Sequence, residues 1–334
     1  MIEVIITIDY EIYGDGTGSL KKLVLEPAAL LLKTCSKWRT PLVLFVEAVE
    51  FERIMRQRAD PAIELVINQL KMAYQNGHEI GLHIHPQWHK GTYQKGKWHL
   101  NNIEYNLCQL PEERIKDVVF QAVEFMKNAL EDSKFSPLTF RAGNWLFQPT
   151  QPAARILYDY GIRIDSSVFK GGRFKEYGVD YRKAINNGYY WKFWEDVATS
   201  LDNGRIIEIP IYTKMVPFWS MITSKRLQIE KSTQRISKDK KSELAMWLSK
   251  FRNYLSLKYP QKLDFCRMTI RELEQAMEEI IKEDNKTPEQ LKPIVAIGHT
   301  KDLKTFDSVD YLLKFLAYNE IKVTTFKDLY PALL

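Results

Sequence analysis

The sequence has few cysteines and no long apolar run. Its three cysteines, Cys35, Cys108 and Cys266, are far apart and show no CxxC or CxH spacing, so neither a disulfide framework nor a thiolate metal site is indicated and a reducing compartment is favoured. No stretch approaches the roughly 18 uninterrupted apolar residues of a membrane-spanning helix. A strand-like run follows Met1 at once, without the basic and apolar regions or the cleavage site of a signal peptide. We therefore expect a soluble, cytoplasmic protein.

Net charge is also small for a chain of 334 residues. The 48 Lys and Arg outnumber the 42 Asp and Glu by six, which does not by itself indicate a nucleic-acid or membrane partner. The charge is unevenly spread, since residues 221–262 contain eleven Lys and Arg against three acidic residues. A solvated helical face would explain this, and so would a docking surface for a diphosphate-linked substrate or an anionic membrane, with Trp247, Phe251 and Tyr254 at the interface. No nucleic-acid recognition motif accompanies these charges, and no nucleic-acid partner is expected.

The sequence is rich in hydrophobic (45%) and aromatic (12%) residues, which is typical of a packed, enzyme-like globule. Short apolar, β-branched runs alternate with helical patterns along most of the chain. The strand-like runs are Ile2 to Asp9, Pro41 to Glu47, Ile80 to His85, Leu138 to Ala142, Gly161 to Val168, Ile206 to Tyr212, Pro293 to Gly298 and Ile321 to Thr325. The helical patterns are Pro27 to Trp38, Pro61 to Gln75, Pro111 to Leu130, Gln151 to Tyr160 and Ser308 to Tyr318. This alternation predicts an α/β fold, a parallel sheet closed into a distorted (β/α) barrel of about seven to eight strands.

Two segments interrupt the alternation. Residues 213–287 are interpreted as a basic helical insertion between two barrel strands, because 221–285 show a helical period and no strand pattern. Within them, Thr269-Ile270-Arg271-Glu272 is typical of a capping box and predicts a helix that ends near Glu283. Residues 86–110, rich in Trp, Tyr, Gly and Lys, are too long for an ordinary connection and predict a functional loop or hairpin beside the site. Residues 1–334 are thus predicted to form one barrel domain with its insertion.

Polar residues at the predicted strand ends suggest chemistry, since active sites of βα barrels are built there. Asp9 and Glu11 are spaced i and i+2, which places both carboxylates on one face, and His83 and His85 share a face in the same way. Two imidazoles and a carboxylate from adjacent strands would form a three-ligand site with open positions, as hydrolytic zinc sites require. Two further polar strand ends are Phe140-Arg141-Ala142-Gly143-Asn144-Trp145 and Ile297-Gly298-His299-Thr300-Lys301-Asp302. Structural roles remain open for each residue alone, such as a turn for Asp9 and a solvated charge for Arg141.

In this order the motifs resemble those of the polysaccharide deacetylases, the NodB-homology group similar to carbohydrate esterase family 4. The resemblance spans Ile2 to Leu303, with the insertion outside it. Thr7-Ile8-Asp9-Tyr10-Glu11 stands in the place of the family's TFDDG motif. This implies that Asp9 is the catalytic base and that Glu11, in place of the usual Asp, is a metal ligand. The segments DYEIYGDGTG and HIHPQW are similar to an uncharacterised subfamily found among surface-polysaccharide genes.

The second family motif contains two metal-binding histidines. Gly77-His78-Glu79-Ile80-Gly81-Leu82-His83 resembles its GHEIGNH portion and implies that His83 is one ligand. Gln87 stands where the family has its second histidine, which leaves His85 and His89 as candidates. We favour His85, because it shares a strand face with His83, whereas His89 lies in the loop beyond.

The remaining motifs supply the other expected site residues. By the resemblance, Arg141 pairs with Asp9 and lowers its pKa, Trp145 forms a wall of the sugar pocket, and His299 is the general acid. Asp165, in a segment similar to the family's DSS strand end, is expected to contact the substrate or to orient the catalytic histidine. Trp88, together with Trp98, would stack on sugar rings, or would be an ordinary core aromatic.

The resemblance implies metal-dependent hydrolysis of an N-acetyl group on an amino sugar, in surface polysaccharide biosynthesis. A divalent ion held by Glu11, His83 and His85, with Zn²⁺ favoured by the mixed N and O ligands, would bind the attacking water and polarise the acetyl carbonyl. Asp9 would take up the proton, and His299 would protonate the departing amine. The expected partner is a carbohydrate, with nucleotide-linked, lipid-linked and polymeric forms all open.

Two alternatives remain at this stage. The same fold and metal would serve a hydrolase of another small linear or cyclic amide, as in the allantoinase-like relatives of the fold. A degenerate barrel that binds glycan without cleaving it is suggested by the missing second Asp of the first motif and the missing HxxxH. Metal analysis separates the last alternative from the other two.

Overall fold

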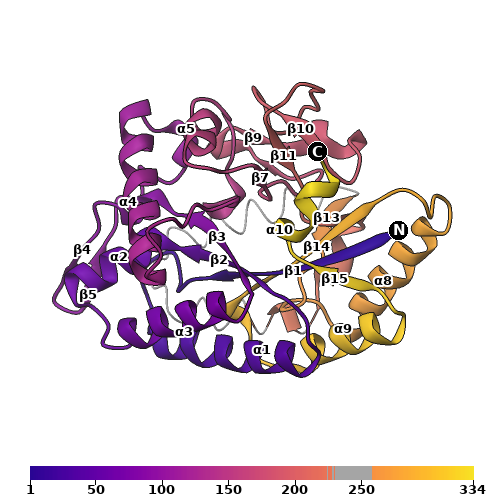
Figure 1. The fold of residues 1–334 in the computed structure, drawn as a ribbon, viewed down its shortest axis with the longest axis horizontal. Helices are drawn as coiled ribbons and strands as arrows, with labels where there is room; N and C mark the ends of the chain where they lie inside the picture. The colour runs from indigo at the N-terminus through magenta and orange to yellow at the C-terminus, as the bar shows by residue number, and fades with distance from the viewer. Residues whose placement is uncertain (224, 228, 230–257) are drawn as a thin grey trace.

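A computed structural model describes residues 1–223, 225–227, 229 and 258–334 of the chain (Figure 1). Its centre is a nine-stranded sheet. In spatial order the strands are β10 (Trp191–Phe193), β11 (Ile206–Glu208), β7 (Ile164–Asp165), β6 (Thr139–Ala142), β3 (Glu79–Ile84), β2 (Val43–Glu47), β1 (Ile2–Tyr10) and β14 (Lys292–His299), and β15 (Lys322–Thr324) also pairs with β1.

The sheet curls until its two ends meet. All of its pairs are parallel apart from β10 with β11. Ile211, just after β11, forms one parallel bridge to Phe169, which follows β7, and another to Val295 of β14. The chain at Ile211 therefore links the two sides of the sheet, and the predicted distorted (β/α) barrel is confirmed.

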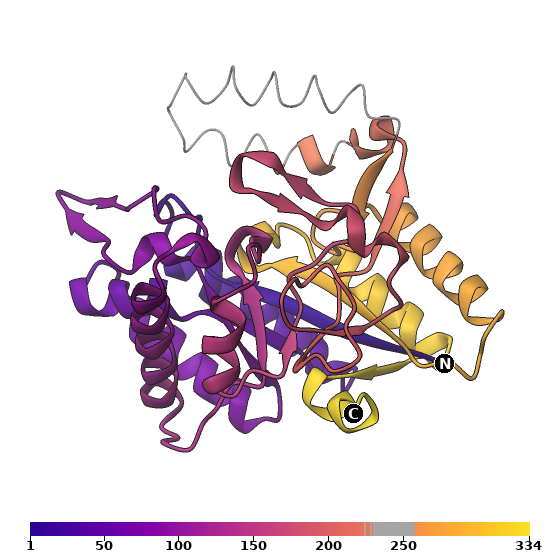
Figure 2. The same ribbon diagram turned by 90° about the horizontal axis from the view of Figure 1, so that it is seen from above.

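Helices cover the outside of this sheet, from α4 on one side to α8 and α9 on the other (Figures 1 and 2). They are α1 (Glu26–Lys37), α2 (Ala48–Gln57), α3 (Ile63–Gln75), α4 (Glu112–Leu130), α5 (Ala153–Asp159), α8 (Ile270–Asp284), α9 (Asp307–Tyr318) and α10 (Phe326–Leu329). The sequence patterns predicted most of them. They missed α2, which follows β2 without a connecting turn and is capped by the side chain of Glu47, an unusual capping residue. Among the described residues, no helix is both long and apolar enough to cross a membrane.

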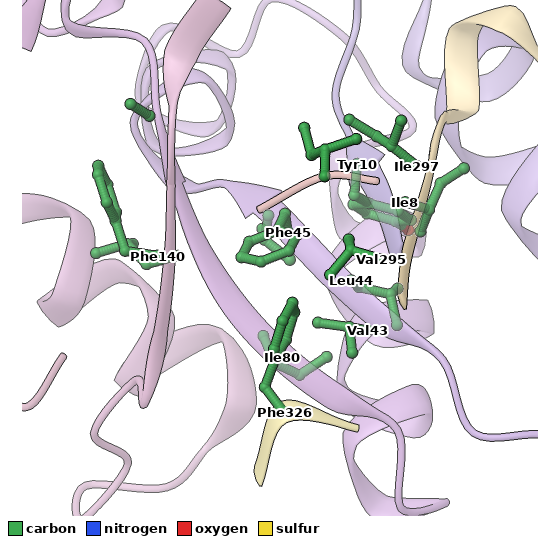
Figure 3. Packing of buried hydrophobic residues seen from close by; sticks show 14 of the residues in the cluster. Ile8, Tyr10, Val43, Leu44, Phe45, Ile80, Phe140, Val295, Ile297 and Phe326 are labelled. Atoms are coloured by element: carbon green, nitrogen blue, oxygen red, sulfur yellow. The ribbon is translucent and has the colours of Figure 1, made fainter. Parts of the chain in front are cut away.

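Buried hydrophobic side chains of the parallel strands pack closely together in the core (Figure 3). Strands β1, β2, β3 and β14 are buried along almost their whole length, which explains their continuous apolar sequence. Phe326 of α10 packs edge-on against Phe45 of β2, with ring centroids 5.9 Å apart. The Lys327 amide donates to Glu79, the first residue of β3. Helix α10 therefore closes the barrel at the amino ends of the strands and leaves the carboxyl ends for the site.

Where the structure describes the segment predicted as a helical insertion, it contains two strands as well as a helix. The capping box at Thr269 and the helix that it begins, α8, are present. The expectation of no strand in 221–285 is wrong, because β13 (Tyr259–Lys262) pairs antiparallel with β12 (Thr213–Val216). The sequence Tyr-Pro-Gln-Lys has no strand pattern of its own, and β12 supplies its partner. The proposed docking residues Trp247, Phe251 and Tyr254 lie outside the described residues.

Two small hairpins complete the fold. Strands β4 (Thr92–Gln94) and β5 (Lys97–His99) form a hairpin within the long 86–110 segment, where the sequence predicted a loop or hairpin. Strands β8 (Arg173–Phe174) and β9 (Val179–Asp180) form the second.

Candidate functional site

The carboxyl ends of strands β1, β3, β6 and β14 bring the candidate residues together. Asp9 of β1 is in register with His299 of β14, and His83 of β3 is in register with Arg141 of β6. Glu11 and His85 follow β1 and β3 directly. All six side chains are buried. The period of two that the sequence suggested for the carboxylates and the imidazoles thus directs both pairs into one pocket.

Three potential metal-binding atoms converge in this pocket. Glu11 Oε2 lies 3.1 Å from His85 Nε2 and 3.5 Å from His83 Nε2, and the two imidazole Nε2 atoms are 3.1 Å apart. Ligand atoms at zinc bond lengths and tetrahedral angles are about 3.3 Å from one another. Glu11 Oε2 is buried and lacks a hydrogen-bond donor. The donor set, its spacing and this unpartnered oxygen therefore fit a divalent ion such as Zn²⁺ bound by three protein ligands.

Backbone and amide contacts orient the two imidazoles. His83 Nδ1 lies 2.7 Å from the Arg141 carbonyl oxygen, which can only accept, so Nδ1 carries the proton and Nε2 presents a lone pair. His85 Nδ1 lies 3.4 Å from the Gln87 side-chain amide and 3.2 Å from that of Asn144. Gln87 Oε1 is buried without a donor, and reversing the Gln87 and Asn144 amides together places their oxygens to accept from His85 Nδ1. Both rings can therefore present Nε2 to the same ion.

His89, the other candidate for second ligand, lies elsewhere. Its Nδ1 is 2.9 Å from an Arg114 guanidinium nitrogen and its Nε2 is 3.5 Å from Asp117. Burial and the neighbouring Arg114 lower the pKa of His89 to about 4. The structure thus places His85, rather than His89, beside His83.

Lys301 compensates the charge of Glu11. Its ammonium lies 2.7 Å from Glu11 Oε1, the oxygen turned away from the imidazoles. Burial by itself would raise the pKa of Glu11, but Lys301 and the two histidines lower it well below its ordinary value. The carboxylate is therefore held ionised, with one oxygen paired and the other free for a metal.

Two further carboxyl groups support the ligands from behind. Glu47, at the end of β2, accepts a 2.8 Å hydrogen bond from the His85 backbone amide, and Glu50 accepts one of 2.9 Å from the Ile12 amide. Burial raises the pKa of Glu47 to about 8, so this group is largely protonated at neutral pH. Together they fix the backbone on either side of the ligand pocket without adding a full second negative charge.

Asp9 is held by a buried ion pair. Its Oδ1 accepts from an Arg141 guanidinium nitrogen at 2.7 Å, and Arg141 also donates to Thr7 and to the Ser166 carbonyl. Burial would raise the pKa of Asp9, but Arg141, followed by His83 and His299, lowers it. Asp9 Oδ2 stays turned toward His299, whose Nε2 is 3.3 Å away. The expected pairing of Arg141 with Asp9 is thus present in the structure.

His299 has an acidic neighbour that the sequence reasoning did not select. Asp302 Oδ2 lies 3.9 Å from His299 Nδ1, and Arg267 donates to the same carboxylate at 2.6 Å and 2.8 Å. Burial lowers the pKa of His299, while Asp9 and Asp302 act against this shift. The imidazole therefore lies between two carboxylates, one at each nitrogen, and these offset part of the burial that lowers its pKa.

Asp165 does not take the place expected of it. It is completely buried, and it accepts hydrogen bonds from the hydroxyl and the amide of Ser167. Ser167 Oγ in turn accepts a 2.8 Å hydrogen bond from the Ala142 amide. Asp165 thus supports the strand that carries Arg141, and the carboxylates beside His299 belong to Asp9 and Asp302.

Of the tryptophans expected at the site, Trp145 lies beside His299 and Trp88 lies in the hydrophobic core. Trp145 is half-buried, and its ring stands edge-on to that of His299 with centroids 5.8 Å apart. Asn144 and Trp145 both have left-handed backbone angles, φ 55° and 60°, which are strained for residues other than glycine and are common at functional sites. Trp88 is fully buried and packs edge-on against Trp98 at 4.9 Å, so it corresponds to the core alternative.

Gly143 allows this loop to pass close to the ligands. A Cβ atom at this position would lie 2.5 Å from the Ile84 carbonyl oxygen and 2.9 Å from Cγ of His85. The glycine is therefore required by the close approach of β6 to His85.

Sequence signals existed for some of the residues that were missed. Glu47 ends a predicted strand as Asp9 does, and Lys301 and Asp302 stand beside His299 in a quoted motif. The roles of Lys301 and Asp302 depend on which side chains the turn after β14 directs inward, and spacing alone does not reveal this. Arg267 lies within the predicted insertion and gave no signal.

Comparisons with solved structures agree on the fold. A protein from Mycobacterium smegmatis described as a polysaccharide deacetylase has 12% identity and a TM-score of 0.53 over 98% of this chain and 88% of that one. A second described in this way, from Pseudomonas aeruginosa PAO1, has 12% identity and a TM-score of 0.51 over 98% and 89%. Puue allantoinase has 13% identity and a TM-score of 0.50 over 98% and 88%. No family model and no curated protein sequence matches the chain. The chain therefore shares the barrel fold of these deacetylases and of the allantoinase.

Proposed function

We propose that this protein is a metal-dependent hydrolase that removes the N-acetyl group from an amino sugar. The observation that carries the proposal is the buried convergence of Glu11, His83 and His85 beside the Asp9–Arg141 ion pair and His299. Solved structures described as polysaccharide deacetylases share the fold, which supports the same activity.

Glu11, His83 and His85 would hold the ion. A divalent cation bound there supplies Lewis acidity toward the acetyl carbonyl oxygen and the attacking water. Lys301 keeps Glu11 ionised and turned toward the imidazoles, and the three ligand side chains are buried. Zn²⁺ suits two nitrogen ligands and one oxygen ligand best.

Asp9 and His299 would move the protons. Arg141 occupies Oδ1 of Asp9, so Oδ2 is the oxygen that accepts a proton from water as the C–O bond forms. His299 donates from Nε2 to the nitrogen as the C–N bond breaks, which releases acetate and a free amine. The proton on Asp9 then passes to His299 across the 3.3 Å between them, and both groups return to their starting states.

The test is acetate release from N-acetylated hexosamines by zinc-loaded protein. We expect activity that a chelator abolishes and that zinc restores. Asp9→Asn should retain the metal and lose about 10²- to 10⁴-fold in rate, because it removes a general base. Full activity of Asp9→Asn would remove the proposed base, and activity unchanged by the chelator would remove the proposed metal.

A hydrolase of a small non-sugar amide is the second candidate. Puue allantoinase shares the fold to the same degree as the deacetylases do. The ligand group and the Asp9–His299 pair would serve either reaction. Trp145 beside His299 favours a sugar, because an indole face suits the apolar face of a pyranose ring. Turnover of allantoin with no acetate release from any acetylated sugar would reverse this preference.

The biological setting that we propose is surface polysaccharide biosynthesis in the cytoplasm, on a nucleotide- or lipid-diphosphate-linked sugar. The basic residues of 221–262 would then contact the diphosphate or an anionic membrane. Charge reversal at Lys240 and Lys241 should reduce sedimentation with anionic vesicles or turnover of a diphosphate-linked substrate. If neither changes, the basic segment has no such role.

A further inference from the structure

A lysine from β13 stands beside the proposed catalytic pocket. The Lys262 ammonium lies 3.6 Å from the ring centroid of Trp145 and 4.2 Å from that of Phe169. Trp145 is the residue that packs edge-on against His299. The lysine therefore belongs to the wall that carries the general acid, although it comes from the segment that the sequence assigned to an insertion.

Backbone pairing fixes Lys262 relative to His299. Lys262 is in register with Thr213 of β12. The next residue, Leu263, accepts a 2.9 Å hydrogen bond from the Ile297 amide, and the Phe265 amide donates to the Ile297 carbonyl at 3.0 Å. Ile297 lies in the same strand as His299, two residues before it. The position of the ammonium is thus set by a rigid β connection.

The other cations of the described site are already paired. They form the pairs Arg141 with Asp9, Lys301 with Glu11 and Arg267 with Asp302. Within the described residues, the Lys262 ammonium has two aromatic rings as neighbours and no carboxylate or carbonyl bonded to it. Asp264 and Asp9 attract the charge from a distance, and Arg267 and Arg141 repel it.

An unpaired ammonium in such a setting is costly to keep charged. Burial lowers the pKa of Lys262 to about 7, so the group is only partly protonated in the free protein near neutral pH. An anion placed against it would restore the charge and would gain a charge-assisted hydrogen bond. The aromatic rings on the other side hold the ammonium in place for that contact.

We infer that Lys262 binds an anionic group on the N-acetylated sugar, a phosphate ester or a carboxylate, and so selects an acidic sugar as substrate. This inference rests on the proposed deacetylase function. It also assigns the Trp145 face that Lys262 covers to cation binding, and it leaves the opposite face for the sugar ring.

The experiment compares three substrates on zinc-loaded enzyme: methyl N-acetylglucosaminide, N-acetylglucosamine 1-phosphate and N-acetylglucosaminuronic acid. Variants are Lys262→Gln, Lys262→Arg and, as a matched control, Lys214→Gln on the partner strand, where Lys214 pairs with Glu279. We expect Lys262→Gln to lower kcat/KM about 10- to 100-fold for the acidic substrates, mainly through KM, and to lower it much less for the neutral glycoside. Lys262→Arg should recover part of the loss, and Lys214→Gln should resemble wild type.

Each result has a defined meaning. The acidic substrate with the larger loss identifies the group as phosphate or as carboxylate. An equal loss on neutral and acidic substrates would overturn the inference, because Lys262 would then only brace Trp145. If wild type deacetylates none of the three, the proposed function fails by itself. In that case, calorimetric binding of glucosamine 1-phosphate and of glucosaminuronic acid to wild type and Lys262→Gln still tests whether Lys262 binds the anionic group. Equal affinities in both proteins would overturn the inference.

Discussion

Replacement of Arg141 by methionine tests the buried ion pair on which the proposed catalytic base depends. Arg141 and Asp9 are both almost completely buried, and their contact is 2.7 Å long. Methionine keeps much of the apolar stem but lacks the guanidinium, whose carbon lies 4.1 Å from the Phe45 ring centroid. It removes the charge and leaves the Asp9 carboxylate without its main partner. Loss of one partner of a buried ion pair costs about 3–5 kcal/mol, and we expect Arg141→Met to be destabilised by this amount near pH 7.5.

The pH dependence of this loss follows from the pKa of Asp9. In wild type that pKa is lowered, so the carboxylate contributes stability that is present above the unfolded pKa and is lost as pH falls through the folded pKa. Without Arg141, burial raises the pKa of Asp9. The free-energy cost of the unpaired carboxylate then applies at pH values above this raised pKa, and it declines at lower pH, where Asp9 takes up a proton. The stability difference between variant and wild type should therefore be smaller near pH 5 than near pH 7.5.

Urea unfolding in the presence of a chelator measures both effects without a contribution from metal binding. The double variant Asp9→Asn with Arg141→Met is the control, because it removes the unpaired charge and should recover most of the loss. An Arg141→Met protein within about 1 kcal/mol of wild type at both pH values would refute the reasoning, since breaking a buried pair costs more than that. So would a double variant as unstable as the single one.

Three other outcomes are expected. Gly143→Ala should weaken zinc binding about 10-fold or more, because its Cβ would displace His85; isothermal titration measures this, and an unchanged affinity would contradict the close approach. Asp302→Asn should lower kcat with little change in KM and should shift the pH profile of kcat, because His299 loses the carboxylate beside Nδ1. A pH profile identical to that of wild type would mean that Asp302 only pairs with Arg267 and does not act on His299. Burial raises the pKa of Glu79 to about 7, so wild-type stability should fall between about pH 4.5 and 7, because the folded protein keeps a proton that the unfolded chain has released. Glu79→Gln lacks this proton, and its unfolding free energy relative to wild type should rise over that interval by up to about 3 kcal/mol, whereas a constant difference would exclude a raised pKa.

The sequence predicted the barrel because its central strands are buried on both faces. Strands such as β1 and β14 need apolar, β-branched residues along their whole length, and this need is visible without any tertiary information. Strands β7 and β11 are shorter than predicted, two and three residues long. Their apolar runs continue as bridged but irregular chain around Ile211, where the barrel closes. Hydrophobicity does not distinguish these two forms of buried backbone.

The first layer of the candidate site was also accessible from sequence. Pairs spaced i and i+2 at strand ends share a face, and this placed Glu11 with Asp9 and His85 with His83. The second layer was not accessible. Asp302 and Lys301 reach the site through a turn after β14, and Arg267 and Lys262 reach it from a segment whose pairing with β14 and β12 no local pattern indicates. Asp165 is the opposite case: its position matches a family motif, but in the structure it bonds Ser167 and supports the strand that carries Arg141.

The most direct test of the central claim measures zinc content and acetate release in the same preparations of wild type, His85→Ala and His89→Ala. Both histidines are buried and lie four residues apart, but only His85 has its Nε2 beside Glu11. We predict one zinc ion per chain and acetate release from an N-acetylated sugar for wild type and His89→Ala, and the loss of both for His85→Ala. A His85→Ala protein that keeps its zinc and its activity, or a wild type that binds no zinc while folded, would contradict the account.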